Sequence, residues 1–448
     1  MRTHLVLGLV ACGVAACGDD AVAPVVDGSA AADVATPIDA GADVVVVPPT
    51  VKSCTGKNVV ADAWVADPKM CVEKFAGGLG RVRQMAFAPN GDLFVHSAGA
   101  VVVLLDDDKD GASANAERST FATAPGLNHG VAFSRDSKFL YASSDTTIYR
   151  WAYASGDRKA TGAAEVVVKG IPGGGHDTRT LVFDSQGRLI VNVGSGSNVD
   201  ATQNLWDTRG MVRRFAIPQT IPSGGLDYAT GEVFASGLRN EVGLTVDGKD
   251  RVWGVENGRD DLFDSDNGGD IHNDNPGEEI NFLSDGTTRF FGYPICWSEF
   301  KVATGGKGAG TQWADQSGAV PQPSMKTDPW CQDTKNVHPP AFVMQGHWAP
   351  LGITQYSGTS LPWAGDLIIA SHGSWDRQPA TGRVLARAKM NGDTVQSVEV
   401  VVAQKDSGGN ASQGTWGYRL VDVQQGPDQA IYVSDDLGGN VFRVGYTP

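Results

Sequence analysis

The stretch LVFDSQGRLIVNVG, residues 181–194, joins two short apolar segments through a turn of Asp, Ser, Gln and Gly. Apolar segments of this length on either side of turn residues predict two antiparallel strands. The early copies of this unit recur at roughly 45 to 60 residues, the length of a four-stranded propeller blade. The further copies are MAFAPNGDLFV (85–95), VAFSRDSKFLYAS (131–143), LTVDGKDRVWGVENG (244–258), VDVQQGPDQAIYVSDD (421–436) and the weaker ITQYSGTSLPWAGDLIIASHG (353–373). Six copies predict an all-β fold, a six-bladed β-propeller of four-stranded antiparallel blades.

The composition agrees with this architecture, and the net charge argues against nucleic-acid binding. The chain has 448 residues, of which 57 are Gly and 11 are Trp, and 41% are hydrophobic. This composition suits short strands joined by tight turns, and a parallel α/β fold is disfavoured because crossover helices are missing from the pattern. The formal net charge of −15 repels phosphate backbones, so we expect no nucleic-acid partner.

The N-terminus is typical of an export signal. Arg2 precedes an apolar segment, residues 5–16, that is too short to cross a bilayer. The following VAAC (14–17) matches a bacterial lipobox, which predicts a lipoprotein signal peptide over residues 1–17 and lipidation of Cys17. Two alternatives stay open: Cys12, with a very short apolar region, and an ordinary secretory signal. We expect an exported protein anchored at the periplasmic face, the outer membrane or the cell surface of a Gram-negative bacterium.

Three further regions follow the signal. Residues 18–50 contain almost only Ala, Asp, Val, Pro and Gly, which predicts a disordered linker. Residues 51–448 would form the propeller, with an insertion at 286–345. Four cysteines remain in this part, and an exported protein with four predicts two disulfides. Sequence proximity favours Cys54–Cys71 and Cys296–Cys331 among three possible connectivities.

One acidic segment, DDDKDGASANAE (106–117), has the spacing of a calcium-binding loop. Asp106, Asp108 and Asp110 alternate, Gly111 permits a sharp bend, and Glu117 stands at the twelfth position. An apolar strand precedes the loop, so we expect a structural calcium site between strands. The alternative is a solvated acidic turn.

Other polar motifs stand beside the repeats. GGGHDTR (173–179) carries His176, Asp177 and Arg179, and in FASGLRNEVGLTV (234–246) Arg239 and Asn240 precede a predicted buried strand. A long acidic loop covers 256–282, Arg377 lies in ASHGSWDRQ (370–378), and Arg419 lies in WGYRLVDV (416–423). Each alone is more simply a structural pair. Arginines beside several repeats favour an anionic ligand in the central channel.

Taken in order, the motifs resemble one family. They are RQMAFAPNGDLFV, HDTRTLVFDSQGRLIVNVGS, ASGLRNEVGL, NDNPGEEINF, FFGYPICW, PLGI, SHGSWDR and VDVQQGPDQAIYVSDD, and they span nearly the whole predicted propeller. The chain resembles the soluble quinoprotein sugar dehydrogenases, six-bladed propellers that use pyrroloquinoline quinone (PQQ). Within them it is most similar to the sorbosone/pyranose dehydrogenase-like branch.

The resemblance implies roles for particular residues. His176 would be the general base that takes the proton of a sugar's anomeric hydroxyl while a hydride passes to the quinone, and Arg239 would stabilise the oxyanion that forms. A calcium ion on PQQ would be held by main-chain carbonyls at 273–276, which gives Asn273, Asp274 and Asn275 as metal ligands. The cofactor-binding residues would be Gln84, Asp177, Arg239, Asn240, Arg377 and Arg419.

The sequence departs from the glucose-oxidising branch at Glu241-Val242, where that branch has a Gln, and at the region of Arg377, where it has a Lys. The expected function is PQQ-dependent oxidation of an aldose or related sugar or aldehyde, with electrons passed to an external quinone or cytochrome. Two alternatives remain: a calcium-dependent propeller lactonase or other hydrolase, and a non-catalytic surface propeller that binds carbohydrate or protein.

Overall fold

The computed structural model describes residues 54–200, 208–284, 289–316 and 327–447. All of them belong to the unit Pro49–Pro448. The predicted signal peptide (1–17), Cys17 and the linker (18–50) lie outside the described residues. Within the described part, no helix has the length and hydropathy needed to cross a bilayer.

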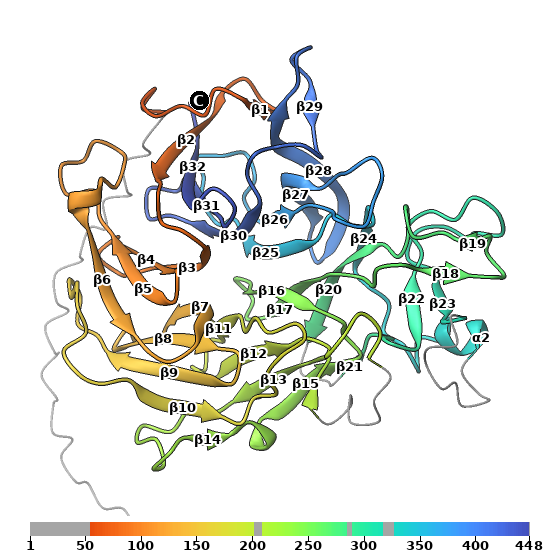
Figure 1. Cartoon of the computed structure of the whole chain (residues 1–448), viewed down its shortest axis with the longest axis horizontal. Helices are drawn as coiled ribbons and strands as arrows, with labels where there is room; N and C mark the ends of the chain where they lie inside the picture. Colours follow the sequence, from red (N-terminus) through yellow and green to blue (C-terminus); the bar gives the residue numbers. More distant parts are fainter. Residues whose placement is uncertain (1–53, 201–207, 285–288, 317–326, 448) are drawn as a thin grey trace, which may run out of the picture. The chain divides into compact units, whose positions relative to one another are not determined.

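Six sheets form the blades of a propeller (Figure 1). Each copy of the repeat forms the first two strands of one blade, because its apolar halves pair across the Asp-, Asn- or Gly-containing turn. The first strands of neighbouring blades contact one another in the order β3, β7, β11, β16, β25, β30 and back to β3. They therefore surround the central axis, and later strands lie progressively further out.

The first three blades follow the chain directly. Their first four strands are antiparallel, and a short fifth strand adds in parallel to the second and third blades. The strands are β3 (Val82–Phe87), β4 (Leu93–Ser97), β5 (Ala100–Leu104) and β6 (Arg118–Thr123); β7 (Leu127–Phe133), β8 (Phe139–Ser144), β9 (Thr147–Ala152), β10 (Glu165–Lys169) and β14 (Leu226–Asp227); and β11 (Leu181–Phe183), β12 (Leu189–Val193), β13 (Met211–Phe215), β15 (Glu232–Ser236) and β21 (Arg289–Phe290).

Of the last three blades, the fifth and the sixth include a strand from the N-terminal end of the propeller. The strands are β16 (Glu241–Val246), β17 (Val252–Glu256), β20 (Glu278–Ser284) and β24 (Phe342–Met344); β25 (Pro350–Gln355), β26 (Leu367–His372), β27 (Arg383–Asn391), β28 (Thr394–Lys405), β1 (Ala63–Val65) and β29 (Ala411–Ser412); and β30 (Leu420–Gln425), β31 (Ile431–Asp435), β32 (Asn440–Tyr446) and β2 (Met70–Ala76). β2 pairs with β32, so hydrogen bonds between the two ends of the propeller close the ring.

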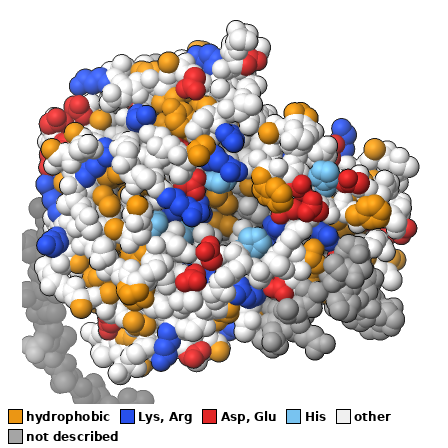
Figure 2. Space-filling view, viewed as in Figure 1, with side chains coloured by type: hydrophobic (Ala, Val, Ile, Leu, Met, Phe, Trp, Pro, Cys, Tyr) orange, Lys and Arg blue, Asp and Glu red, His pale blue; other side chains and the backbone are white. Residues whose placement is uncertain are grey.

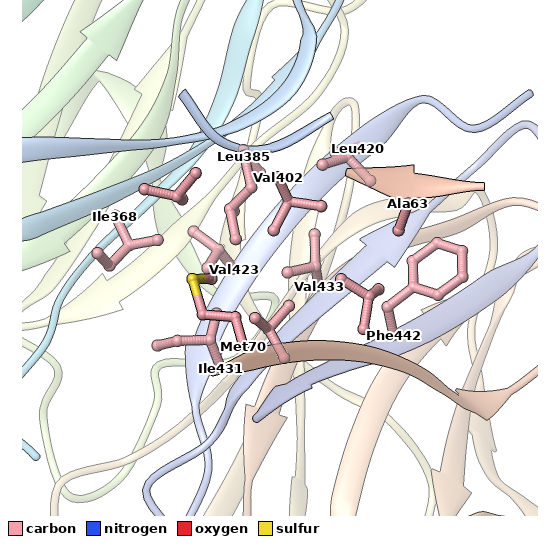
Figure 3. Packing of buried hydrophobic residues seen from close by; sticks show 14 of the residues in the cluster. Ala63, Met70, Ile368, Leu385, Val402, Leu420, Val423, Ile431, Val433 and Phe442 are labelled. Carbon is pink, nitrogen blue, oxygen red and sulfur yellow. The ribbon is translucent and has the colours of Figure 1, made fainter. Parts of the chain in front are cut away.

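The core consists of apolar clusters between neighbouring blades, one for each of the six junctions. Strands packed on both faces carry continuous apolar segments, as the repeats do. Figure 3 shows the junction of the last two blades, where Ile368 and Leu385 of one sheet meet Val423, Ile431 and Val433 of the next.

Both predicted disulfides are confirmed: Cys54–Cys71 and Cys296–Cys331. The first ties the start of the described chain to β2. The second lies in the segment 286–345, which contains the hairpin β22 (Cys296–Ser298) and β23 (Gln312–Ala314) and the short helix α2 (Asp328–Cys331). The ends of this segment are edge strands of two blades, β21 and β24. A separate hairpin, β18 (Phe263–Asp264) and β19 (Gly269–Asp270), precedes β20.

Candidate active site

A cavity of about 200 Å³ lies at one mouth of the channel. Because the first two strands of a blade are antiparallel, the loop before the first and the loop after the second reach the same mouth. Loops from the third to the sixth blades meet here. The polar residues that line it include His176, Arg239, Asn240, Glu278, His372 and Arg419. Figure 2 shows Lys, Arg and His side chains gathered near the middle of the visible face.

His176 lies in the loop before β11 with its ring orientation fixed. Its Nδ1 lies 3.1 Å from the carbonyl oxygen of Ser195 and 2.9 Å from Ser195 Oγ. The Ser195 hydroxyl donates to the carbonyl of Ser197 at 2.8 Å, so both Ser195 oxygens act as acceptors. Nδ1 therefore carries the hydrogen, and Nε2 of the neutral ring keeps its lone pair.

The electrostatics of the cavity keep His176 neutral. Burial, and then the charge of Arg239, lower the pKa of His176 to about 4. The loop around it is rigid, since the buried guanidinium of Arg179 donates to the carbonyls of Pro172, His176 and Thr178. Arg179 is thus a structural residue, and close packing adds to the constraint: a Cβ on Gly194 would lie 2.6 Å from that of His176.

Arg239 and Asn240, before β16, form the adjacent wall. The Arg239 guanidinium donates to Asp260 Oδ2 at 2.7 Å, to the Gly258 carbonyl at 2.7 Å and to both oxygens of Asn198 at 3.0 Å. Asn240 is also buried, and its Oδ1 has no hydrogen-bond partner within the described residues.

Arg419 and His372, from the sixth and fifth blades, form another wall of the cavity. Arg419 donates from Nε and Nη2 to the carbonyls of His372 and Gly373 at 2.9 and 2.6 Å, which leaves Nη1 for a ligand. His372 Nε2 lies 2.8 Å from Asp436 Oδ1, and Arg83 pairs with Asp436 at 2.7 Å. Although burial alone would raise the pKa of Asp436, His372 and Arg83 hold it far below its usual value.

These contacts extend into a series of hydrogen bonds that connects all six blades. Arg83 Nε donates to His129 Nδ1 at 3.0 Å, His129 Nε2 lies 3.0 Å from Thr180 Oγ1, and Thr180 donates to the Val242 carbonyl. Since Arg83 can only donate, His129 must carry its hydrogen on Nε2. This chain of groups fixes the position of His372, which lines the cavity.

Glu278 is a cavity residue that the sequence analysis missed. Its carboxylate accepts from the backbone N–H of Gly258 at 2.7 Å and of Ala349 at 3.0 Å, and burial raises its pKa to about 8. It fixes two loops against each other. The adjacent Glu279 belongs to a second buried group with Glu241 and Glu256, whose carboxylates surround the amide of Asn281. Only the paired glutamates of NPGEEINF hinted at this arrangement.

Three predicted cofactor residues do not line this cavity. Gln84 is buried within β3, and its amide bonds the backbone of Val131 and Leu181 in two neighbouring blades. Asp177 is exposed. Arg377 donates instead to the carbonyls of Pro379 and Asn273 at 2.7 and 2.8 Å and to Asp274 Oδ1 at 3.1 Å. Their cofactor roles remain predictions.

The predicted metal ligands fall into two places. Oxygens of Asp106, Asp108 and Glu117 lie within 4.8 Å of one another; Asp110 is outside this group. The Asn275 side chain bonds the backbone of Phe300 and Lys301, and the Arg377 guanidinium already contacts Asn273 and Asp274.

A third set of groups could hold a metal ion at the cavity. Ligand atoms of Asp260, His347 and Asp376 lie within 4.8 Å of one another, and the first two residues line the cavity. The Nε2 of His347 lies 2.5 Å from the His272 carbonyl, which leaves Nδ1 as its ligand atom. No motif in the sequence pointed to this set, because its members come from three separate loops.

Known proteins share this architecture. The family model described as TrAA12-like matches residues 64–447. The chain is 28% identical over 400 residues to the pyrroloquinoline quinone-dependent pyranose dehydrogenase of Coprinopsis cinerea, a match that covers 82% of this chain and 52% of that protein. The chain thus spans about half the length of this relative.

Two further matches cover more of their counterparts. The chain is 29% identical over 349 residues to the pyrroloquinoline quinone-dependent sugar dehydrogenase of Hypocrea jecorina, covering 73% of this chain and 77% of that protein. The calcium structure of a family AA12 carbohydrate-active enzyme from Trichoderma reesei superposes with a TM-score of 0.76 at 26% identity, covering 89% of this chain and 100% of that one.

Proposed function

This chain belongs to the TrAA12-like family, and on that premise we propose that it is an oxidoreductase that oxidises an aldose or related sugar with PQQ as its cofactor. The observation that carries the proposal is the convergence in one cavity of a neutral imidazole with a free Nε2 and two arginines from different blades. The PQQ-dependent names of the relatives from Coprinopsis cinerea and Hypocrea jecorina support it.

The residues present fit PQQ, an aromatic tricarboxylate. Arg419 offers Nη1 to a carboxylate, and Arg239 adds positive charge at the adjacent wall. Asn240 lines the same wall of the cavity as Arg239. When bound, PQQ supplies a quinone carbon that accepts a hydride.

The protein's own part in the reaction is positioning and proton transfer. His176 holds its ring by donating from Nδ1 to Ser195, so that Nε2 can take the proton of the anomeric hydroxyl. Because its pKa is about 4, the ring is in the accepting form at neutral pH. Arg239 is fixed beside it and would stabilise negative charge that develops on an oxygen in the cavity.

The direct test is an absorbance titration of the purified protein with PQQ, with and without calcium, followed by dye-linked oxidation of aldoses. We expect saturable PQQ binding and sugar-dependent dye reduction. A protein that shows no bound PQQ spectrum under either condition would contradict the proposal. The calcium arm tests a second cofactor, Ca²⁺, which the acidic loop at 106–117 and the calcium structure of the Trichoderma reesei enzyme favour.

One observation favours a different chemistry. The Asp260, His347 and Asp376 set could hold a cation that activates water, as a propeller lactonase requires. Lactone hydrolysis that needs a divalent cation and is unaffected by PQQ would select this function over sugar oxidation.

We also infer that the protein is exported, anchored by lipid on Cys17 and passes electrons to an external quinone or cytochrome. The support is the VAAC (14–17) motif behind a short apolar segment. Metabolic labelling with a radioactive fatty acid should mark the wild-type protein and not Cys17→Ala. Labelling that survives this substitution would move the anchor elsewhere.

A further inference from the structure

One aromatic side chain at the cavity is largely exposed to solvent. Trp375, in the loop after β26, lines the cavity and is 69% exposed. It is the only exposed tryptophan among the described residues, and no ring or cation pairs with its indole within that part of the chain. An exposed indole keeps a large apolar surface in water, and such surfaces usually mark binding sites.

The backbone around Trp375 holds the indole in this position. Gly373 N–H donates to the Trp348 carbonyl at 2.9 Å, and Ser374 N–H donates to the Thr381 carbonyl at 2.8 Å. On the other side, the Asp376 carboxylate accepts from the N–H of Asp261 at 2.8 Å. The exposure of Trp375 is therefore built into the fold and does not result from a loose loop.

The cavity has a buried base and a solvent-exposed edge, which suit a cofactor and a substrate respectively. Arg239, Asn240 and Glu278 line its base and are at most 9% exposed, which suits a charged cofactor held deep in the channel. Trp375 stands at the solvent edge, on the side from which a substrate must arrive. The walls between them are polar, with His176 and His372.

A pyranose ring matches this combination of an aromatic edge and polar walls. One face of the ring carries C–H groups, which the electron-rich face of an indole attracts, while hydroxyl groups project from its perimeter toward hydrogen-bonding partners. We propose that Trp375 is the platform on which the C–H face of a pyranose substrate stacks. The inference rests on the proposed sugar oxidation and specifies where the sugar binds.

The test is calorimetric titration with methyl β-D-glucopyranoside and methyl β-D-galactopyranoside, whose blocked anomeric oxygens prevent turnover, with and without PQQ. We expect Trp375→Ala to weaken pyranoside binding on the order of tenfold and Trp375→Phe to weaken it less. The matched control is Phe263→Ala, which removes another exposed aromatic ring that does not line the cavity and should leave pyranoside binding unchanged.

Two results would overturn the proposal. Equal pyranoside affinity in wild type and Trp375→Ala, including no binding by either, would remove the platform role. Loss of PQQ binding in Trp375→Ala would assign the indole to the cofactor. If instead the proposed oxidation is wrong, the result differs, because the wild-type protein itself would then not bind PQQ. For active protein, a raised KM for pyranoses with unchanged KM for the acyclic glyceraldehyde is the expected kinetic counterpart.

Discussion

The acidic loop at 106–117 and the cavity around His176 both gather polar groups, but over very different distances in the chain. The loop brings Asp106, Asp108 and Glu117 together within twelve consecutive residues. The cavity takes His176, Arg239, His372 and Arg419 from four blades. A local cluster depends on one turn, whereas an assembled cavity depends on the register of every blade. We therefore expect changes in the cavity to alter chemistry and changes in the loop to alter stability.

The largest expected effect is that of His176→Ala. Removal of the imidazole whose Nδ1 is held by Ser195 and whose Nε2 can accept a proton should lower turnover on the order of a hundredfold or more, while PQQ binding persists. Steady-state kinetics with a PQQ titration would measure both. Gln186→Ala, in the turn between β11 and β12, is the control because it lies outside the cavity and should turn over normally. Unchanged turnover in His176→Ala would dismiss the base role.

Arg419 and Arg377 are both predicted to bind the cofactor, but only Arg419 lines the cavity. Arg419→Gln removes a guanidinium that lines the cavity, and we expect PQQ affinity to fall by about ten- to a hundredfold, since charged hydrogen bonds contribute about 1.5 to 3 kcal/mol. Arg377→Gln should weaken PQQ binding less, because that guanidinium contacts Asn273 and Asp274. Equal losses in the two variants would mean that Arg377 reorients toward the cofactor.

The pH dependence follows from the lowered pKa of His176. The base must be neutral, and its pKa falls from 6.5 to about 4 in the folded protein, so kcat/KM should hold through pH 6.5 and halve near pH 4. The same shift means that the unfolded chain binds this proton first, so stability from this group is lost as pH falls from about 6.5 to about 4. A fall of kcat/KM with an apparent pKa near 6.5 would contradict the lowered pKa of His176.

The smallest effect is expected at the acidic loop. If the loop holds calcium, adding calcium should raise the melting temperature by a few degrees through mass action on the folded state. Asp108→Asn should remove most of that rise and leave turnover intact. Differential scanning calorimetry in calcium and in a chelator would measure it. If the melting temperature of the wild-type protein does not change with calcium, the loop is a solvated acidic turn.

Much of the fold could be predicted from local patterns. Each repeat became the first two strands of a blade, because apolar segments flanking a turn pair with their immediate neighbours whatever the rest of the chain does. The closure of the ring by β2 and β32 could not be predicted, since residues from the two ends of the propeller meet there without a shared motif.

The candidate site divides in the same way. The motifs indicated His176, Arg239 and Arg419, because positions beside repeat strands lie at a channel mouth. They did not separate Arg377 from Arg419, or find Glu278 and Trp375. Those distinctions depend on which acceptor lies nearest to a guanidinium and which loops pack over a carboxylate.

By itself, the sequence determined the repeats, the two disulfide pairs that proximity favoured and the spacing of the acidic loop. All of these depend on residues that are close together in the chain. Only the tertiary structure decided which side chains share the cavity, which protonation state His176 adopts and which tryptophan stays exposed. These properties depend on burial and on distances between blades, which are fixed only when the six sheets pack around one axis.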